Sequence, residues 1–209
     1  MQELISEFTK RESKIRDWLA SVRTKWQSRD DVLFELLFCL CTPQSKAPVC
    51  RAAINKLREK GLMHAAGGKD VSEHITGVRF PNNKAGYITK AQTAFPSIYQ
   101  KIVELHAQPL ELREWLVKNV KGYGYKEASH FLRNIGLGEE LAILDVHILR
   151  ELANAGVINK DEGEKGGFSP KRYLVIEAEF LKLASKFGLK PAELDIAIWL
   201  ARSGNAEIM

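Results

Sequence analysis

The fold is decided by the stretch Val120-Lys121-Gly122-Tyr123-Gly124-Tyr125-Lys126-Glu127-Ala128, in which one residue separates two glycines. Apolar residues recur at helical spacing before this stretch and again after it. Glycine tolerates a left-handed backbone, so the pair predicts a tight turn that joins two helices. The N–H groups of such a turn and the positive end of a helix both favour an anion. A glycine pair alone is equally compatible with a plain helix–helix turn.

An amine and a carboxylate follow this hairpin. Lys126 is expected in the first turn of the second helix, and Asp145 stands where the next apolar helical pattern begins. A lysine becomes nucleophilic when desolvation or nearby positive charge lowers its pKa from about 10.4. Asp is also a preferred N-cap, so the local pattern predicts that Asp145 caps a helix. The two roles are compatible, because a capping carboxylate is held rigidly.

The segment from Val120 to Arg150 resembles the helix-hairpin-helix and aspartate signature of the DNA glycosylase superfamily that includes endonuclease III. Residues 124–134 (GYKEASHFLRN) and 142–145 (AILD) most closely resemble the type 2 8-oxoguanine DNA glycosylases of archaea and some bacteria. The resemblance implies a bifunctional DNA repair enzyme with Lys126 as the catalytic lysine and Asp145 as the catalytic aspartate. It would excise 8-oxoguanine from duplex DNA and cleave the abasic site by β-elimination through a lysine Schiff base.

The resemblance also assigns the hairpin to the DNA backbone. It implies that Lys121, Gly122, Tyr123, Gly124 and Tyr125 hold phosphates, with a monovalent cation on the hairpin carbonyls. The family often has a basic residue where this chain has Val146, so one backbone contact is expected to be missing here.

Two loops resemble the loops of the superfamily that contact the duplex where a base has been extruded. An extruded base leaves a gap, and opening it costs a few kcal/mol. In the loop 40–45 (LCTPQS), Gln44 is expected to fill the gap, because an amide both donates and accepts hydrogen bonds. In the loop 78–85 (VRFPNNKA), Arg79 and Phe80 are expected to wedge the opposite strand. The structural alternatives are a surface turn at Gln44 and an anchor for a helix start at Phe80.

The base pocket is expected at the end of the chain. Residues 194–199 (LDIAIW) resemble the last helix of the family, whose matching Trp stacks on the flipped purine, although Trp199 is equally compatible with core packing. The final residues of the family reach the base and usually end in lysine, whereas this chain ends in Met209. Two alternatives stay open: a glycosylase for an oxidised pyrimidine or alkylated purine, and a non-catalytic helix-hairpin-helix DNA-binding protein.

Composition agrees with a nucleic-acid partner. The 209 residues include 31 Lys and Arg against 26 Asp and Glu, a net charge of +5 that modestly favours polyanions. No apolar run approaches the roughly 18 residues of a membrane span, and the first residues do not form a signal peptide. We expect a cytoplasmic, nucleoid-associated monomer that binds double-stranded DNA and no membrane.

The three cysteines indicate core thiols rather than a metal site. Cys39, Cys41 and Cys50 lie in one apolar segment, and no cysteine follows them. Relatives in the superfamily carry a four-cysteine iron–sulfur cluster near the C-terminus, so this chain is expected to have no cluster. The five histidines show no ligand spacing, and no metal site or other cofactor is expected.

Apolar periodicity predicts an all-α fold, since no segment alternates as a strand does. Helices are expected over 4–26, 31–40, 47–60, 71–75, 82–103, 110–120, 126–135, 145–155, 169–188 and 191–204. By resemblance, residues 31–144 form one lobe with the helix-hairpin-helix, and residues 1–30 plus 145–209 form the other. DNA would enter the cleft between the two lobes.

Overall fold

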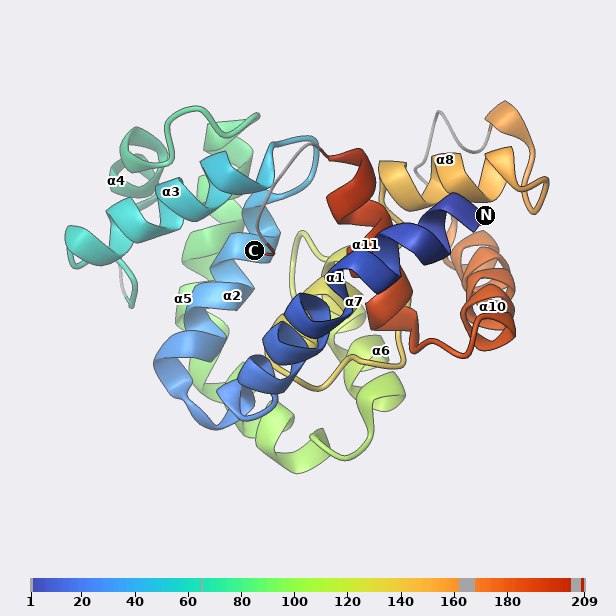
Figure 1. Ribbon diagram of the computed structural model, residues 1–209. Helices are drawn as coiled ribbons and strands as arrows, with labels where there is room; N and C mark the ends of the chain where they lie inside the picture. The colour runs from blue at the N-terminus through green and yellow to red at the C-terminus, as the bar shows by residue number, and fades with distance from the viewer. Residues whose placement is uncertain (1, 65, 162–167, 204–207, 209) are drawn as a thin grey trace. The chain divides into compact units, whose positions relative to one another are not determined.

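The chain is helical in the computed structural model, which describes residues 2–64, 66–161, 168–203 and 208 (Figure 1). These residues contain no β-strand, so the all-α class predicted from the sequence is confirmed. The helices are α1 (Gln2–Val22), η1 (Lys25–Gln27, a 3₁₀ turn), α2 (Arg29–Cys41), α3 (Ala47–Glu59), α4 (Gly68–His74), α5 (Pro81–Leu105), α6 (Pro109–Asn119), α7 (Tyr125–Asn134), α8 (Val146–Asn154), α10 (Pro170–Lys186) and α11 (Pro191–Arg202). Within this described part, no helix combines the length and the apolarity that a bilayer span requires.

The helices form two compact units. Unit 1 comprises Met1–Val22 and Gly138–Ile208, and unit 2 comprises Arg23–Leu137. The lobe limits expected from the family resemblance, 31–144 and 1–30 plus 145–209, remain a prediction.

Helix α2 is the centre of unit 2. All its residues from Val32 to Cys41 are buried, and α2 packs against η1, α3, α5 and α7. Ser28 caps this helix by accepting a hydrogen bond from the Asp31 N–H (3.3 Å). The three cysteines are free and buried, and the prediction of reduced core thiols is thereby confirmed. A helix buried all round therefore places the loop 42–45, which directly follows it, in a fixed position.

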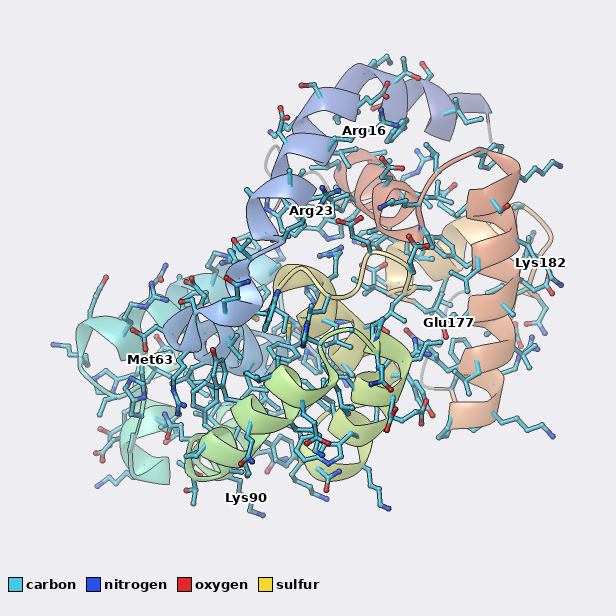
Figure 2. The ribbon with its side chains drawn as sticks, turned by 90° about the horizontal axis from the view of Figure 1, so that it is seen from below. Arg16, Arg23, Met63, Lys90, Glu177 and Lys182 are labelled. Atoms are coloured by element: carbon cyan, nitrogen blue, oxygen red, sulfur yellow. The ribbon has the colours of Figure 1, made fainter. Side chains whose placement is uncertain are left out.

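In unit 1, α1 packs along α11 (Figure 1). Their shared core consists of Phe8, Ile15, Leu19, Ala192, Ile196, Ala197 and Leu200. Arg16 of α1 (Figure 2) adds a hydrogen bond from its Nε to Glu193 Oε1 at 2.9 Å. Helix α10 begins as predicted, with Ser169 accepting from the Arg172 N–H (3.3 Å) and Pro170 at the first helical position.

The first helix is shorter than its apolar pattern predicts. It ends at Val22, whereas the pattern continues to Trp26. Trp26 lies in η1, donates its N–H to the Ile135 carbonyl (3.1 Å) and stacks on His106 with ring centroids 4.4 Å apart. The prediction was wrong here because Trp26 packs against other residues of unit 2 and not as part of the first helix. Apolar periodicity does not show which element an apolar side chain packs against.

Candidate functional site

The predicted hairpin joins α6 to α7. The Tyr123 N–H donates to the Val120 carbonyl (3.1 Å) and closes the turn. Gly122 has φ +100°, and a Cβ there would lie 2.7 Å from Tyr87 Cδ2. Gly124 has φ −108° and ψ −173°, which any residue adopts. The requirement for a left-handed backbone therefore holds for Gly122 and not for Gly124.

The hairpin side chains do not share one role. Tyr123 is buried, donates its hydroxyl to the Leu36 carbonyl (3.0 Å), and has a pKa that burial raises well above its usual range. Tyr125 donates its hydroxyl to Glu114 Oε2 (2.7 Å), and Lys121 is exposed. Tyr123 thus anchors the hairpin to α2, whereas Lys121 lies exposed on the same hairpin.

Lys126 occupies the second position of α7 and is held at both sides. Its side chain is 23% exposed, and its Nζ donates to Thr42 Oγ1 at 3.4 Å. Glu127 Oε1 lies 3.7 Å from the same Nζ, and Glu127 Oε2 accepts the Gly124 N–H at 3.2 Å. One carboxylate therefore links the hairpin backbone to the candidate nucleophile.

Asp145 caps α8 as the sequence predicts. Its Oδ1 accepts the N–H groups of His147 (2.8 Å) and Ile148 (3.0 Å). A carboxylate held by two backbone donors keeps one orientation, as a catalytic group must. Asp145 belongs to unit 1 and Lys126 to unit 2.

Helix α10 holds the segment that leads to Asp145. The Tyr173 hydroxyl donates to the Ala142 carbonyl (2.9 Å) and accepts the Leu144 N–H (3.4 Å). Glu177 (Figure 2) accepts the Ala142 N–H through Oε1 at 3.1 Å. Two buried side chains of one helix thereby fix the backbone just ahead of the capping carboxylate.

The expected gap-filling and wedge residues lie on adjoining loops of unit 2. Gln44 and Phe80, with φ 56° and 57°, are the non-glycine residues with positive φ in the described part of the chain. Such a backbone costs about 1–3 kcal/mol and concentrates at functional sites. Phe80 is 51% exposed, and the Arg79 guanidinium lies 5.4 Å from its ring centroid. The Arg79 N–H donates to Ser45 Oγ (3.0 Å), so the two loops are hydrogen-bonded to each other.

The two expected base-pocket residues differ in what the structure says of them. Trp199 is half-buried and packs against the α1–α11 core of unit 1, which accounts for its contacts without a ligand. Met209 lies outside the described residues. Across residues 2–64, 66–161, 168–203 and 208, no cluster of three His, Cys, Asp or Glu side chains could hold a metal ion.

Sequence reasoning missed the residues that support the site. Thr42, Glu127, Tyr173 and Glu177 carried no expected role. Thr42, Tyr173 and Glu177 act through contacts that close only in the folded chain. Thr42 and Lys126, for example, are 84 positions apart. Glu127 alone had a readable signal, because Glu at the third position of a helix is typical of a reciprocal cap.

Comparison with known proteins places the chain in a family. Residues 3–189 match the family model described as 8-oxoguanine DNA glycosylase. A Fusobacterium nucleatum 8-oxoguanine DNA glycosylase/AP lyase is 37% identical over 198 residues, which cover 92% of this chain and 90% of that one. The corresponding Methanocaldococcus jannaschii protein is 45% identical over 182 residues, covering 86% and 84%.

Solved structures show the same fold. The 8-oxoguanine DNA glycosylase of Thermotoga maritima superposes with a TM-score of 0.84 at 30% identity, over 99% of this chain and 97% of that one. The Methanocaldococcus jannaschii enzyme in complex with a 15mer DNA containing 8-oxoguanine also gives 0.84, at 29% identity over 100% of both chains. The fold and the hairpin site are those of a helix-hairpin-helix DNA glycosylase. This chain belongs to the 8-oxoguanine DNA glycosylase family.

Proposed function

We propose that this chain excises 8-oxoguanine from duplex DNA and then cleaves the strand at the abasic site. The observation that carries the proposal is the position of Lys126. Its partly exposed amine stands in the first turn of α7, directly after the hairpin, in a chain of the 8-oxoguanine DNA glycosylase family. A non-catalytic DNA-binding module has no need of a half-buried amine at this point.

The hairpin would bind the DNA backbone. The first N–H groups of α7 lack partners within the helix, and the helix dipole favours a phosphate there. The Gly124 N–H already serves Glu127, so the N–H groups of Gly122 and Lys126 are the proposed donors. The exposed Lys121 adds a charge, and binding should weaken as salt rises because counterions are released.

The base would leave the stack with help from the strained loops. We assign Gln44 to the vacated space and Arg79 with Phe80 to the opposite strand, because all three are exposed on loops joined by the Arg79–Ser45 bond. Trp199 would stack on the flipped purine, as in the family resemblance. Met209 is assigned to the same pocket by resemblance alone.

The chemistry then follows in two stages. Asp145 stabilises positive charge on the sugar and accepts one proton from the Lys126 ammonium. The free amine then attacks C1′ while the glycosidic bond breaks, and the base departs with the bonding electrons and takes up the proton that Nζ loses on attack. The proton held by Asp145 passes to O4′ when the C1′–O4′ bond breaks. Opening of the sugar ring gives an imine between Nζ and C1′. The imine acidifies C2′, and loss of that proton expels the 3′ phosphate, which breaks the C3′–O bond. General acid–base catalysis of this kind contributes about 10²–10⁴-fold.

Three further assignments accompany the proposal. The hairpin carbonyls are neutral oxygen donors, which suit a hard monovalent cation better than a transition metal. Comparing DNA affinity in K⁺ and in tetramethylammonium at equal ionic strength would test this site. We also place the enzyme at the nucleoid, where its substrate lies, and propose that it acts as a monomer, which the elution volume of the free protein tests.

Borohydride trapping tests the function. Reduction of the imine should link wild-type protein covalently to duplex DNA containing 8-oxoguanine, and Lys126→Gln should neither trap nor nick. Lys90→Gln, which removes the same charge from an exposed position of α5 (Figure 2), should trap as wild type does. Parallel duplexes with an oxidised pyrimidine or an alkylated purine serve as competitors. The proposal would be refuted if Lys126→Gln nicked DNA at the wild-type rate, or if the wild-type protein preferred another lesion.

A further inference from the structure

Lys84 is a buried lysine, which is rare in proteins. It lies near the start of α5, and only 4% of its surface is exposed. Burial lowers the pKa of its ammonium, since desolvation disfavours the charged form. A charge kept at such a place needs a compensating set of partners.

Those partners all belong to the turn that carries Gln44. The Lys84 Nζ donates to the carbonyls of Cys41 (2.6 Å) and Pro43 (2.7 Å) and to Ser45 Oγ (3.1 Å). An ammonium has three donors, and here each has one acceptor. The three acceptors bracket Gln44 on both sides, so the bonds restrain the strained φ of 56° at that residue.

The same lysine joins this turn to the wedge loop. The Lys84 N–H donates to the Phe80 carbonyl (3.1 Å), and Ser45 Oγ, which receives the ammonium, also receives the Arg79 N–H (3.0 Å). The other side of the turn is held by Lys126, whose Nζ donates to Thr42 (3.4 Å). The 41–45 turn is therefore fixed between the wedge loop and the candidate nucleophile.

We propose that Lys84 is a positioning residue that holds the Gln44 turn in the conformation that fills the gap left by the extruded base. The inference rests on the proposed function. Lys84 itself touches neither the base nor the reacting sugar; it acts through Gln44. Without the ammonium, the Pro43 carbonyl loses the Lys84 donor and the Cys41 carbonyl keeps only the weak Cys50 thiol donor (3.1 Å). The turn can then relax from its strained backbone, which withdraws the amide from the vacated space.

A double-mutant cycle tests this role. The variants are Lys84→Met, which keeps the length of the side chain without its donors, Gln44→Ala, and the two combined, with Lys90→Met as the charge-matched control. The measurement is the single-turnover rate of excision from duplex DNA with paired 8-oxoguanine. A misplacement of about 1 Å can cost about 100-fold in rate, so a loss of that order is expected for Lys84→Met.

The combination decides the outcome. If Lys84 acts through Gln44, the double variant should be no slower than the slower single variant. Losses that multiply, or a wild-type rate for Lys84→Met, would overturn the positioning role. A merely structural defect would lower the rate independently of Gln44, and so the two effects would multiply.

Two further measurements keep the test decisive. If circular dichroism shows that Lys84→Met does not fold, Ser45→Ala is used instead, because it removes only the hydroxyl that accepts from Lys84 and Arg79. This variant should slow excision, and its loss should be non-additive with that of Gln44→Ala. An unchanged rate, or losses that multiply, would overturn the positioning role. A wild-type protein that excises no 8-oxoguanine would instead refute the proposed function. The two failures are therefore distinguishable.

Discussion

Gly122 and Gly124 look equivalent in the sequence, and the structure predicts that they are not. An alanine at position 122 would have to adopt φ +100° and would place its Cβ 2.7 Å from Tyr87 Cδ2 and 3.1 Å from Leu40 Cδ2. An alanine at position 124 would keep an ordinary extended backbone. Its Cβ would meet the movable end of Glu127 at 3.2 Å. The pair thus provides a test and its own matched control.

The expected cost of Gly122→Ala follows from three contributions. A left-handed backbone costs a non-glycine residue about 1–2 kcal/mol. Overpacking against Tyr87 and Leu40 adds about 1–3 kcal/mol. The smaller conformational freedom of the unfolded alanine chain returns about 0.4–1 kcal/mol. The sum is a destabilisation of about 3 kcal/mol, whereas for Gly124→Ala the last contribution offsets the mild contact and leaves a change near zero.

Equilibrium unfolding in urea, followed by circular dichroism, measures both differences. For a chain of this size, about 3 kcal/mol corresponds to a Tm roughly 6–12 °C lower. Gly122→Ala should also weaken DNA binding, because the hairpin amides move with the turn, while Gly124→Ala should bind nearly as wild type does. Equal stability losses for the two variants, or a loss for Gly122→Ala within about 0.5 kcal/mol, would refute the reasoning.

Two further predictions concern Asp145 and Tyr123. Asp145→Asn keeps an oxygen that can cap α8 but removes the charge, so the rate of excision should fall by about 10²–10⁴-fold with little change in stability. Asp145→Ala also removes the cap and should add a stability loss of about 1 kcal/mol. Normal excision by Asp145→Asn would show that the carboxylate has no part in the mechanism. Tyr123→Phe removes the hydroxyl that donates to the Leu36 carbonyl and should destabilise the protein by about 1 kcal/mol. Because burial raises the folded-state pKa of Tyr123, its contribution is fully present below the unfolded pKa near 10 and is lost as pH rises above it. Unfolding measured between about pH 9 and 11 should therefore show a steeper alkaline loss for wild type than for Tyr123→Phe, and identical slopes would contradict the burial of this hydroxyl.

The sequence carries the helices and their ends well, because both are local properties. Periodic apolar residues predicted the helices, and Asp145 predicted a helix start that the structure confirms. Local reading failed where a residue serves a distant partner. Trp26 continues the apolar pattern of the first helix, yet it packs on His106 outside that helix.

By itself, the sequence determined that this chain is all-helical, that a glycine hairpin precedes a lysine, and that an aspartate caps a later helix. These follow from backbone sterics, helical period and capping, which act between neighbours in the chain. Only the tertiary structure decided that Tyr123 is buried in the core and that, of the two hairpin glycines, Gly122 is the one that must lack a side chain. The tertiary structure also decided that Lys84 is hydrogen-bonded to the turn that carries Gln44. Such decisions depend on which groups meet after burial, and Lys84 reaches Cys41 across 43 positions of sequence.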